Sequence, residues 1–173
     1  MMRIAYFNYL WDVRESSVGA AAHIGEIARA LKLEGHEVAL YNLNRFPGGS
    51  GQEARPFRQF LKKRLSRMLN QVNALASNRR YRREERAVLD RDKPDLVWMR
   101  YHLLSFSLCS LASRRGLPFV LELNAPIAYE AKRFSEFWQI PFLPAWLEKW
   151  NARKADALVV VSRALKEYYT AWG

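Results

Sequence analysis

Short apolar runs of β-prone residues alternate along this chain with segments of helical periodicity, and this alternation limits the possible fold more than any other feature. The strand-like runs are Arg3–Asn8, Glu37–Tyr41, Asp95–Met99, Pro118–Leu123 and Asp156–Val161. Strands and helices that alternate in this way indicate β-α-β units and a doubly wound parallel α/β sheet. We therefore predict one Rossmann-like domain over residues 1–173, a length that suits a single hydrophobic core.

Two glycines mark the expected ends of helices. Apolar positions recur at helical spacing within 18–31, and Gly35 follows this stripe. A second helix is predicted over 103–115, with Gly116 directly after it. Glycine accepts the left-handed conformation that commonly ends a helix, so both predictions have a physical stop signal.

The C-terminal third is expected to contain an irregular stretch, a helix, a strand and a final helix. Residues 124–141 are predicted to be irregular, and proline favours a helix start near 144–154. The near-continuous apolar run 156–161 predicts a strand covered on both faces. Ser162 is the expected N-cap of the last helix.

The net charge of +11 is concentrated in one segment. Residues 54–86 hold eleven Arg and Lys against two Glu, a net of 11 − 2 = +9. Apolar residues from Phe57 to Leu75 recur at spacings of three and four, so we predict a basic helical segment at about 54–90, with a second helical stretch running through Arg91. Such a concentrated field indicates an anionic partner.

Two interpretations of this basic segment stay open. Its apolar stripe can lie in the headgroup region of an anionic membrane, or it can pack on the sheet and leave the charges in solvent. Nucleic acid is an unlikely partner, because the charge is accompanied by no RNP, KH or helix-turn-helix pattern. The predicted anion-binding or membrane surface consists of Arg58, Lys62, Lys63, Arg79, Arg80, Arg82 and Arg83.

Candidate ligand-binding residues follow the first and third strands, because open α/β sheets bind ligands at the carboxyl ends of their strands. Gly19 opens the first helix, where free N–H groups suit a phosphate, and His23 lies one turn further along. Arg100 follows the third strand and can clamp a phosphate or carboxylate, with Tyr101 beside it. Each also has a structural alternative, such as an ion pair or a helix start.

The fourth strand and its exit supply two carboxylates and an amide, Glu122, Asn124 and Glu130. Together they offer the donors and acceptors that bind sugar hydroxyls. Glu122 alternates with leucines, so it can instead be a buried acid paired with a base, and Asn124 can be a turn former.

Several classes of protein are excluded. The chain has one cysteine and three scattered histidines, so no metal site is expected, and no cofactor is predicted. No nucleophile-elbow or P-loop pattern is present. We expect a cytoplasmic protein, because the chain shows no secretory leader and no apolar run long enough to span a bilayer.

Five segments, in this order, resemble the N-terminal domain of glycosyltransferase family 4, retaining enzymes of the two-domain GT-B fold. They are Met2–Phe7 with Gly19 and His23, Gly35–Val38, Lys93–Val97 with Arg100 and Tyr101, Val120–Pro126 with Glu130, and Ala155–Ser162. The basic segment has no counterpart in this pattern.

This resemblance implies transfer of a sugar from a nucleotide-sugar donor to an acceptor, with retention and without a metal. The N-terminal domain of such enzymes shapes the acceptor site. Gly19 corresponds to the loop near the donor phosphates, Arg100 to an arginine found in some members, and Asn124 to a position where many members have histidine. Because asparagine is no base, the resemblance implies that Asn124 orients the sugar or acceptor; Glu130 is the second candidate catalytic residue.

The resemblance also implies that a C-terminal domain, not contained in these 173 residues, binds the nucleotide. We therefore expect the chain to fold but to transfer no sugar alone. The acceptor is expected to be lipid-linked or part of the cell envelope, at the inner membrane face. The competing hypotheses are a basic nucleic-acid-binding domain and a stand-alone nucleotide- or sugar-binding regulator.

Overall fold

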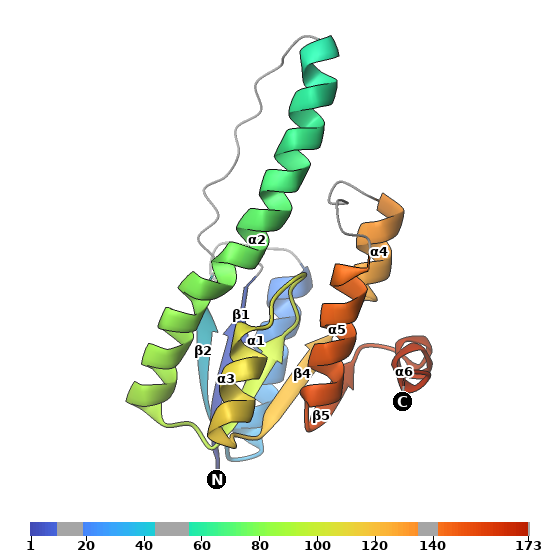
Figure 1. The fold of residues 1–173 in the computed structure, drawn as a ribbon. Helices are drawn as coiled ribbons and strands as arrows, with labels where there is room; N and C mark the ends of the chain where they lie inside the picture. Colours follow the sequence, from blue (N-terminus) through green and yellow to red (C-terminus); the bar gives the residue numbers. More distant parts are fainter. Residues whose placement is uncertain (10–18, 44–55, 135–141, 173) are drawn as a thin grey trace.

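A computed structural model describes residues 1–9, 19–43, 56–134 and 142–172, with the backbone alone for 19–21, 56–71 and 131–134. Within these ranges five strands form one parallel sheet in the order β2-β1-β3-β4-β5 (Figure 1). The strands are β1 (Arg3–Asn8), β2 (Glu37–Asn42), β3 (Leu96–Arg100), β4 (Phe119–Leu123) and β5 (Ala157–Val160). The predicted α/β class and parallel sheet are confirmed.

The helices flank the sheet on both faces, with α1 on one face and α2, α3 and α5 on the other (Figure 1). They are α1 (Gly19–Leu33), α2 (Pro56–Asp92), α3 (Ser107–Arg115), α4 (Ile127–Phe134), α5 (Leu143–Lys154) and α6 (Arg163–Thr170). Parallel neighbours need a crossover connection, which explains why a helix follows each strand.

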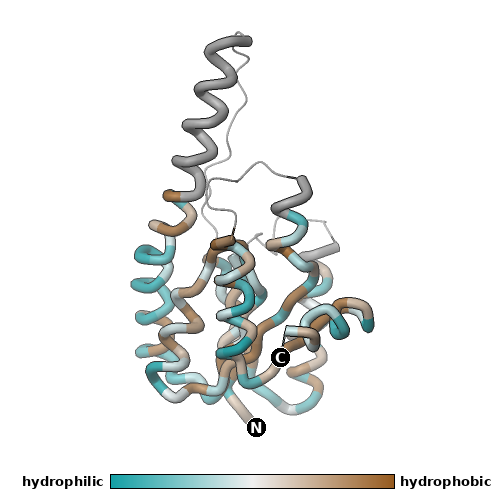
Figure 2. The backbone as a smooth tube through the Cα atoms, turned by 45° about the vertical axis from the view of Figure 1, so that its right-hand side comes forward, coloured by the Kyte–Doolittle hydropathy of each residue, from teal (hydrophilic) through white to brown (hydrophobic). Residues whose placement is uncertain are grey.

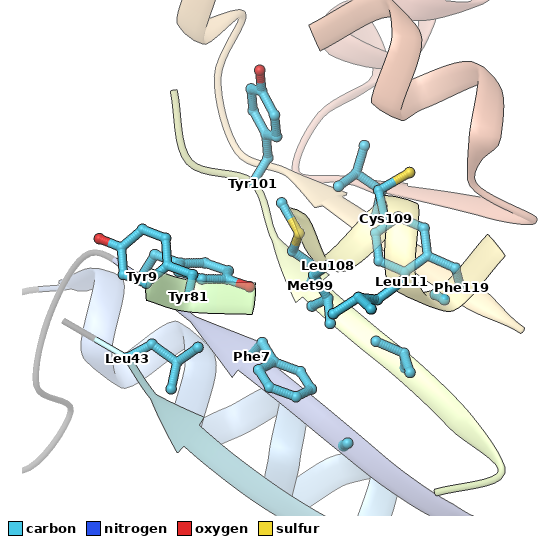
Figure 3. Close-up of a cluster of buried hydrophobic side chains, with 14 of the residues drawn as sticks. Phe7, Tyr9, Leu43, Tyr81, Met99, Tyr101, Leu108, Cys109, Leu111 and Phe119 are labelled. Atoms are coloured by element: carbon cyan, nitrogen blue, oxygen red, sulfur yellow. The ribbon is translucent and has the colours of Figure 1, made fainter. Parts of the chain in front are cut away.

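Successive side chains of each strand point to opposite faces, and this divides the core in two. Ala5 and Phe7 of β1 belong to the larger cluster, on the face of α2 and α3. Ile4 and Tyr6 belong to the smaller cluster, which packs against α1 through Ile24. Figure 3 shows the larger cluster, and Figure 2 shows how hydrophobic residues concentrate along the sheet.

The predicted helix ends are present. Gly35 has φ = 84° and Gly116 has φ = 63°, both in the left-handed region. The amide of Gly116 donates back to Ser113 O at 3.3 Å, which closes α3. Ser162 caps α6, and its Oγ accepts a hydrogen bond from Leu165 N at 3.2 Å.

The predicted basic helical segment at about 54–90 is confirmed as α2, one continuous helix of 37 residues in place of two stretches. Two other predictions about elements were wrong. The stretch 124–141, predicted to be irregular, contains α4. The strand β5, predicted to be covered on both faces, is exposed at Ala157 and Leu158, the latter to 40%. Its apolar sequence therefore did not indicate two covered faces.

Two buried polar side chains of α2 attach this helix to the start of α3. Asn78 Nδ2 donates to Leu104 O at 2.9 Å, and its Oδ1 accepts from the amides of Phe106 and Ser107 at 2.9 and 3.1 Å. Glu85 Oε1 accepts from Ser107 Oγ at 2.7 Å. Asn78 thus satisfies amides that a helix start otherwise leaves free.

Burial of Glu85 makes stability depend on pH. Burial raises the pKa of Glu85 from 4.5 to about 7, against hydrogen bonds from Tyr9 and Ser107 that lower it. The folded protein therefore holds this proton more tightly than the unfolded chain. The resulting stabilisation is present below pH 4.5 and is lost as pH rises through about 7.

In the wild type, ionisation of Glu85 should lower the free energy of unfolding by roughly 3 kcal/mol as pH rises. We expect the Glu85→Gln variant to lack this decrease. Urea unfolding at about pH 5 and about pH 8 measures it. Glu84→Gln is the matched control, because Glu84 lies on the surface, 3.4 Å from Arg80. An unchanged pH slope in Glu85→Gln would contradict the prediction.

Candidate functional site

The strand order places a topological switch point beside β1. From β1 the chain passes to β2 on one side, and β3 then pairs with β1 on the other side. Ligands of open α/β sheets bind at the carboxyl ends of the strands next to such a point. The polar residues at the ends of β1, β3 and β4 therefore define the candidate site.

Glu122 of β4 is the centre of this site, and its side chain is fully buried. Its Oε2 accepts hydrogen bonds from Tyr6 OH and from Trp98 Nε1, the latter at 3.0 Å. Trp98 comes from β3, which pairs with β4, and Tyr6 comes from β1, on the other side of β3. The Tyr6 hydroxyl keeps its proton, because burial and the Glu122 carboxylate hold the pKa of Tyr6 well above 10.

The other oxygen of Glu122 has three polar neighbours. Asn124 Nδ2 donates to Oε1 at 2.9 Å, and Arg100 Nη1 lies 3.4 Å from it. His23 Nε2, from α1, also lies 3.4 Å from Oε1, but without hydrogen-bond geometry. We call these residues the Glu122 cluster: Tyr6, His23, Trp98, Arg100, Glu122 and Asn124.

The register of the sheet explains why these residues meet. Tyr6 is paired with Trp98 across β1 and β3, and Arg100 is paired with Glu122 across β3 and β4. Paired residues in adjacent strands point to the same face. This is the α1 face, which brings His23 above the same carboxylate.

The ion pair of Arg100 with Glu122 and the unpaired oxygen of Asn124 determine which ligands the cluster can bind. Arg100 is only 8% exposed and neutralises the buried Glu122 carboxylate. Asn124 Oδ1 is buried, with no hydrogen-bond partner among the described residues. A ligand with a hydroxyl or amine donor would satisfy this oxygen, because a buried acceptor without a partner is costly.

The structure brings four predicted residues into one cluster, namely His23, Arg100, Glu122 and Asn124. Tyr6 and Trp98 were not predicted from the sequence. The alternation along β1 and β3 was the available signal, because it puts both side chains on the face of Glu122.

The other predicted site residues lie elsewhere. Gly19 is the first residue of α1, and the loop before it lies outside the described residues. Tyr101 is buried on the opposite face of the sheet, in the larger core cluster (Figure 3). The backbone of Tyr101 contacts the site, since its amide donates a hydrogen bond to Glu122 O at 2.9 Å, but its side chain does not. Glu130 is exposed in the first turn of α4.

The predicted basic surface is only partly described. Arg58, Lys62 and Lys63 lie in α2, but their side chains fall outside the described set. Arg80 forms an ion pair with Glu84 at 3.4 Å. Figure 2 shows many hydrophilic residues along the coloured part of α2.

Four other arginines of α2 lie along one side of the helix, at spacings of three, four and seven residues. We call this set the arginine stripe: Arg79, Arg82, Arg83 and Arg86. Together they line a shallow hollow of about 300 Å³. No ion pair to these four residues is found among the described side chains.

Neither a metal site nor a membrane-spanning helix is found among the described residues. No group of three or more His, Cys, Asp and Glu side chains lies close enough together there to hold a metal ion. None of the described helices combines the length and the apolar character needed to cross a membrane.

Comparisons with known proteins agree with the fold. No curated protein matches the sequence. Among solved structures, the chain is similar to S. aureus MnaA in a co-structure with UDP, with a TM-score of 0.57 and 12% sequence identity. The match covers 100% of this chain and 41% of that one, so this chain spans less than half of its structural neighbour.

The resemblance drawn from the sequence motifs is confirmed by a family model. The model of the glycosyl transferase 4-like domain matches residues 18–173, which is most of the chain. The chain belongs to the glycosyl transferase 4-like domain family.

Proposed function

We propose that this chain is the acceptor-side, N-terminal half of a retaining glycosyltransferase that moves a sugar from a nucleotide-sugar donor to an acceptor. The observation that carries the proposal is the Glu122 cluster at the switch point of the sheet. Family membership supports sugar transfer, and the UDP in the structural neighbour supports a nucleotide-sugar donor.

Glu122 holds the cluster and is not the reacting group. Both of its oxygens face polar neighbours, two on Oε2 and three on Oε1. A carboxylate used in this way has no lone pair left for a substrate proton. Its role is to orient Arg100 and Asn124, as a surrounding shell fixes the groups that contact a ligand.

The groups that contact substrate in this proposal are Arg100, His23 and Asn124. The Arg100 guanidinium has further N–H donors for a phosphate or carboxylate. Asn124 Oδ1 accepts from a sugar or acceptor hydroxyl, and His23 of α1, whose side chain is partly exposed, contacts the same ligand.

Gly19 and Glu130 complete the proposed site from two helix starts. The first N–H groups of α1 have no partner within the helix and suit the donor phosphates, with Gly19 allowing close approach. Glu130 presents an exposed carboxylate to acceptor hydroxyls. Nucleotide binding is assigned to a C-terminal domain, so the 173 residues alone should show no transfer.

The acceptor is proposed to be lipid-linked or part of the cell envelope, at the cytoplasmic membrane face. Support comes from the arginine stripe, a row of exposed or half-exposed cations without acidic partners in the described structure. Such a row attracts anionic lipid headgroups.

The test of the proposed function is sugar transfer by the intact protein that contains this domain, with a panel of nucleotide sugars. Replacing Arg100 by methionine should lower kcat/KM about 10- to 100-fold, since a hydrogen bond to a charged ligand is worth roughly 1.5–3 kcal/mol. Arg29→Met is the matched control, because Arg29 is exposed and forms an ion pair with the exposed Glu26 at 3.6 Å.

Two outcomes would overturn the proposal. One is the absence of transfer from every nucleotide sugar by the intact protein. The other is an Arg100→Met variant that stays folded and keeps kcat/KM within about twofold of the Arg29→Met control. Transfer by the 173-residue chain alone would refute the assignment of nucleotide binding to another domain.

A further inference from the structure

A third buried carboxyl group, Glu148 of α5, joins three segments of the chain. Its side chain is fully buried. Its Oε2 accepts a hydrogen bond from the amide of Ala128, in the first turn of α4, at 2.7 Å. Its Oε1 lies 2.7 Å from the hydroxyl of Tyr169 in α6.

The Tyr169 hydroxyl has one proton and two oxygen neighbours. Besides Glu148 Oε1 it contacts the carbonyl of Ala125 at 3.1 Å. A carbonyl oxygen can only accept, and a phenol donates a single hydrogen bond. Both contacts are therefore satisfied together only if Glu148 donates to Tyr169 while Tyr169 donates to Ala125.

We propose that Glu148 is protonated in the folded protein and that Tyr169, through this shared proton, is a positioning residue for the segment after β4. The chain of donors runs from Glu148 to Tyr169 to the Ala125 carbonyl. Ala125 lies between Asn124 of the Glu122 cluster and α4, which carries Glu130. The effect of Tyr169 on substrate contact rests on the proposed function, whereas its effect on the position of the segment after β4 does not.

The surroundings of Glu148 favour this state. The ionisable groups that face it are Glu130 from α4, Tyr101 after β3, and Tyr168 and Tyr169 from α6. Each of these groups is an acid that is either neutral or negatively charged, so none of them stabilises a negative charge on Glu148. Burial raises the pKa of Glu148 and is the largest effect, the contacts with the Tyr169 hydroxyl and the Ala128 amide lower it, and the charge of Glu130 adds a smaller rise.

Ionisation at higher pH would reverse the hydrogen bond. The Tyr169 hydroxyl would then donate its hydrogen bond to the carboxylate, and the Ala125 carbonyl would lose its donor. We therefore expect the segment after β4 to loosen as pH rises, while the folded state as a whole loses the stabilisation that came from the bound proton.

Amide hydrogen exchange in this 173-residue chain tests the proposal without any transfer assay. In the Tyr169→Phe variant the protection factors of the Ala128 and Glu130 amides should fall about tenfold, the equivalent of one buried hydrogen bond. Tyr168→Phe is the matched control, because Tyr168 is the exposed neighbour in the same helix.

The Glu148→Gln variant separates the two protonation states. Its amide NH₂ can donate to Tyr169 as the protonated acid does, while its oxygen still accepts from Ala128. We expect protection factors within about twofold of the wild type and, unlike the wild type, no decrease with rising pH. Protection lost in Glu148→Gln as strongly as in Tyr169→Phe would overturn the proposal, as would unchanged protection in Tyr169→Phe.

Transfer by the intact protein then tests the connection to the site. Tyr169→Phe should raise KM for the acceptor more than it lowers kcat, because the hydroxyl positions the segment and touches no substrate. Wild-type transfer with unchanged KM in Tyr169→Phe would refute the positioning role. Absence of transfer in the wild type would refute the proposed function and leave the exchange result standing.

Discussion

Replacement of Glu122 by leucine should lower the free energy of unfolding by about 3–5 kcal/mol, the range for breaking a buried ion pair from one side. Arg100 would stay buried and charged without its partner. Tyr6 OH and Trp98 Nε1 would each lose their acceptor, and a buried donor without a partner carries its own cost. Since a domain is stable by about 5–15 kcal/mol, this loss is a large fraction of the total free energy of unfolding.

Urea unfolding followed by circular dichroism measures this loss, and two variants show its origin. Glu26→Ala removes an exposed carboxylate, 3.6 Å from Arg29, and should cost less than about 1 kcal/mol. The double variant Glu122→Leu with Arg100→Met should recover part of the loss, because no buried charge is left unpaired. A single-variant loss below about 1 kcal/mol would show that the carboxylate does not hold the cluster.

Removal of the arginine stripe should weaken binding to anionic vesicles about 1000-fold. The variant changes Arg79, Arg82, Arg83 and Arg86 to glutamine. Each basic residue near such a surface contributes about 1 kcal/mol, so four contribute about 4 kcal/mol. The wild-type protein should pellet with phosphatidylserine vesicles at low salt and be released as salt shortens the range of the field.

The control variant removes the same number of charges from other exposed positions. It changes Arg29, Lys32, Arg114 and Arg163 to glutamine. We expect at most about a tenfold loss, because these residues are spread over three helices. Equal losses in both variants would contradict a localised surface. Failure of the wild type to bind vesicles, or tighter binding to duplex DNA than to vesicles, would contradict the membrane assignment.

The sheet could be predicted from the sequence because each strand carries its own local signal. Strands β1, β3 and β4 are runs of apolar residues, and Gly35 and Gly116 stop the helices where a left-handed residue is needed. The exposure of β5 could not be predicted, because it depends on which elements pack on this strand in space. Leu158 is apolar whether or not a neighbour covers it.

Four residues of the candidate site, Glu122 among them, were predicted from the sequence, but their arrangement around Glu122 was not. His23, Arg100 and Asn124 follow strand ends or a helix start, which sequence reasoning can locate. That all three meet one carboxylate depends on the register of β3 with β4, which no local pattern specifies. Likewise, the attachment of α2 through Asn78 and Glu85 depends on tertiary contacts that lie far apart in the sequence.

The division of the sheet into two faces has a consequence for engineering this domain. Phe7, Met99 and Leu121 fill the face under α2 and α3, while Tyr6, Arg100 and Glu122 occupy the other face of the same strands. Repacking the first set can therefore change thermal stability without altering the Glu122 cluster. A library that varies alternate positions of β1, β3 and β4 would select for stability on one face and would test the proposed ligand site on the other.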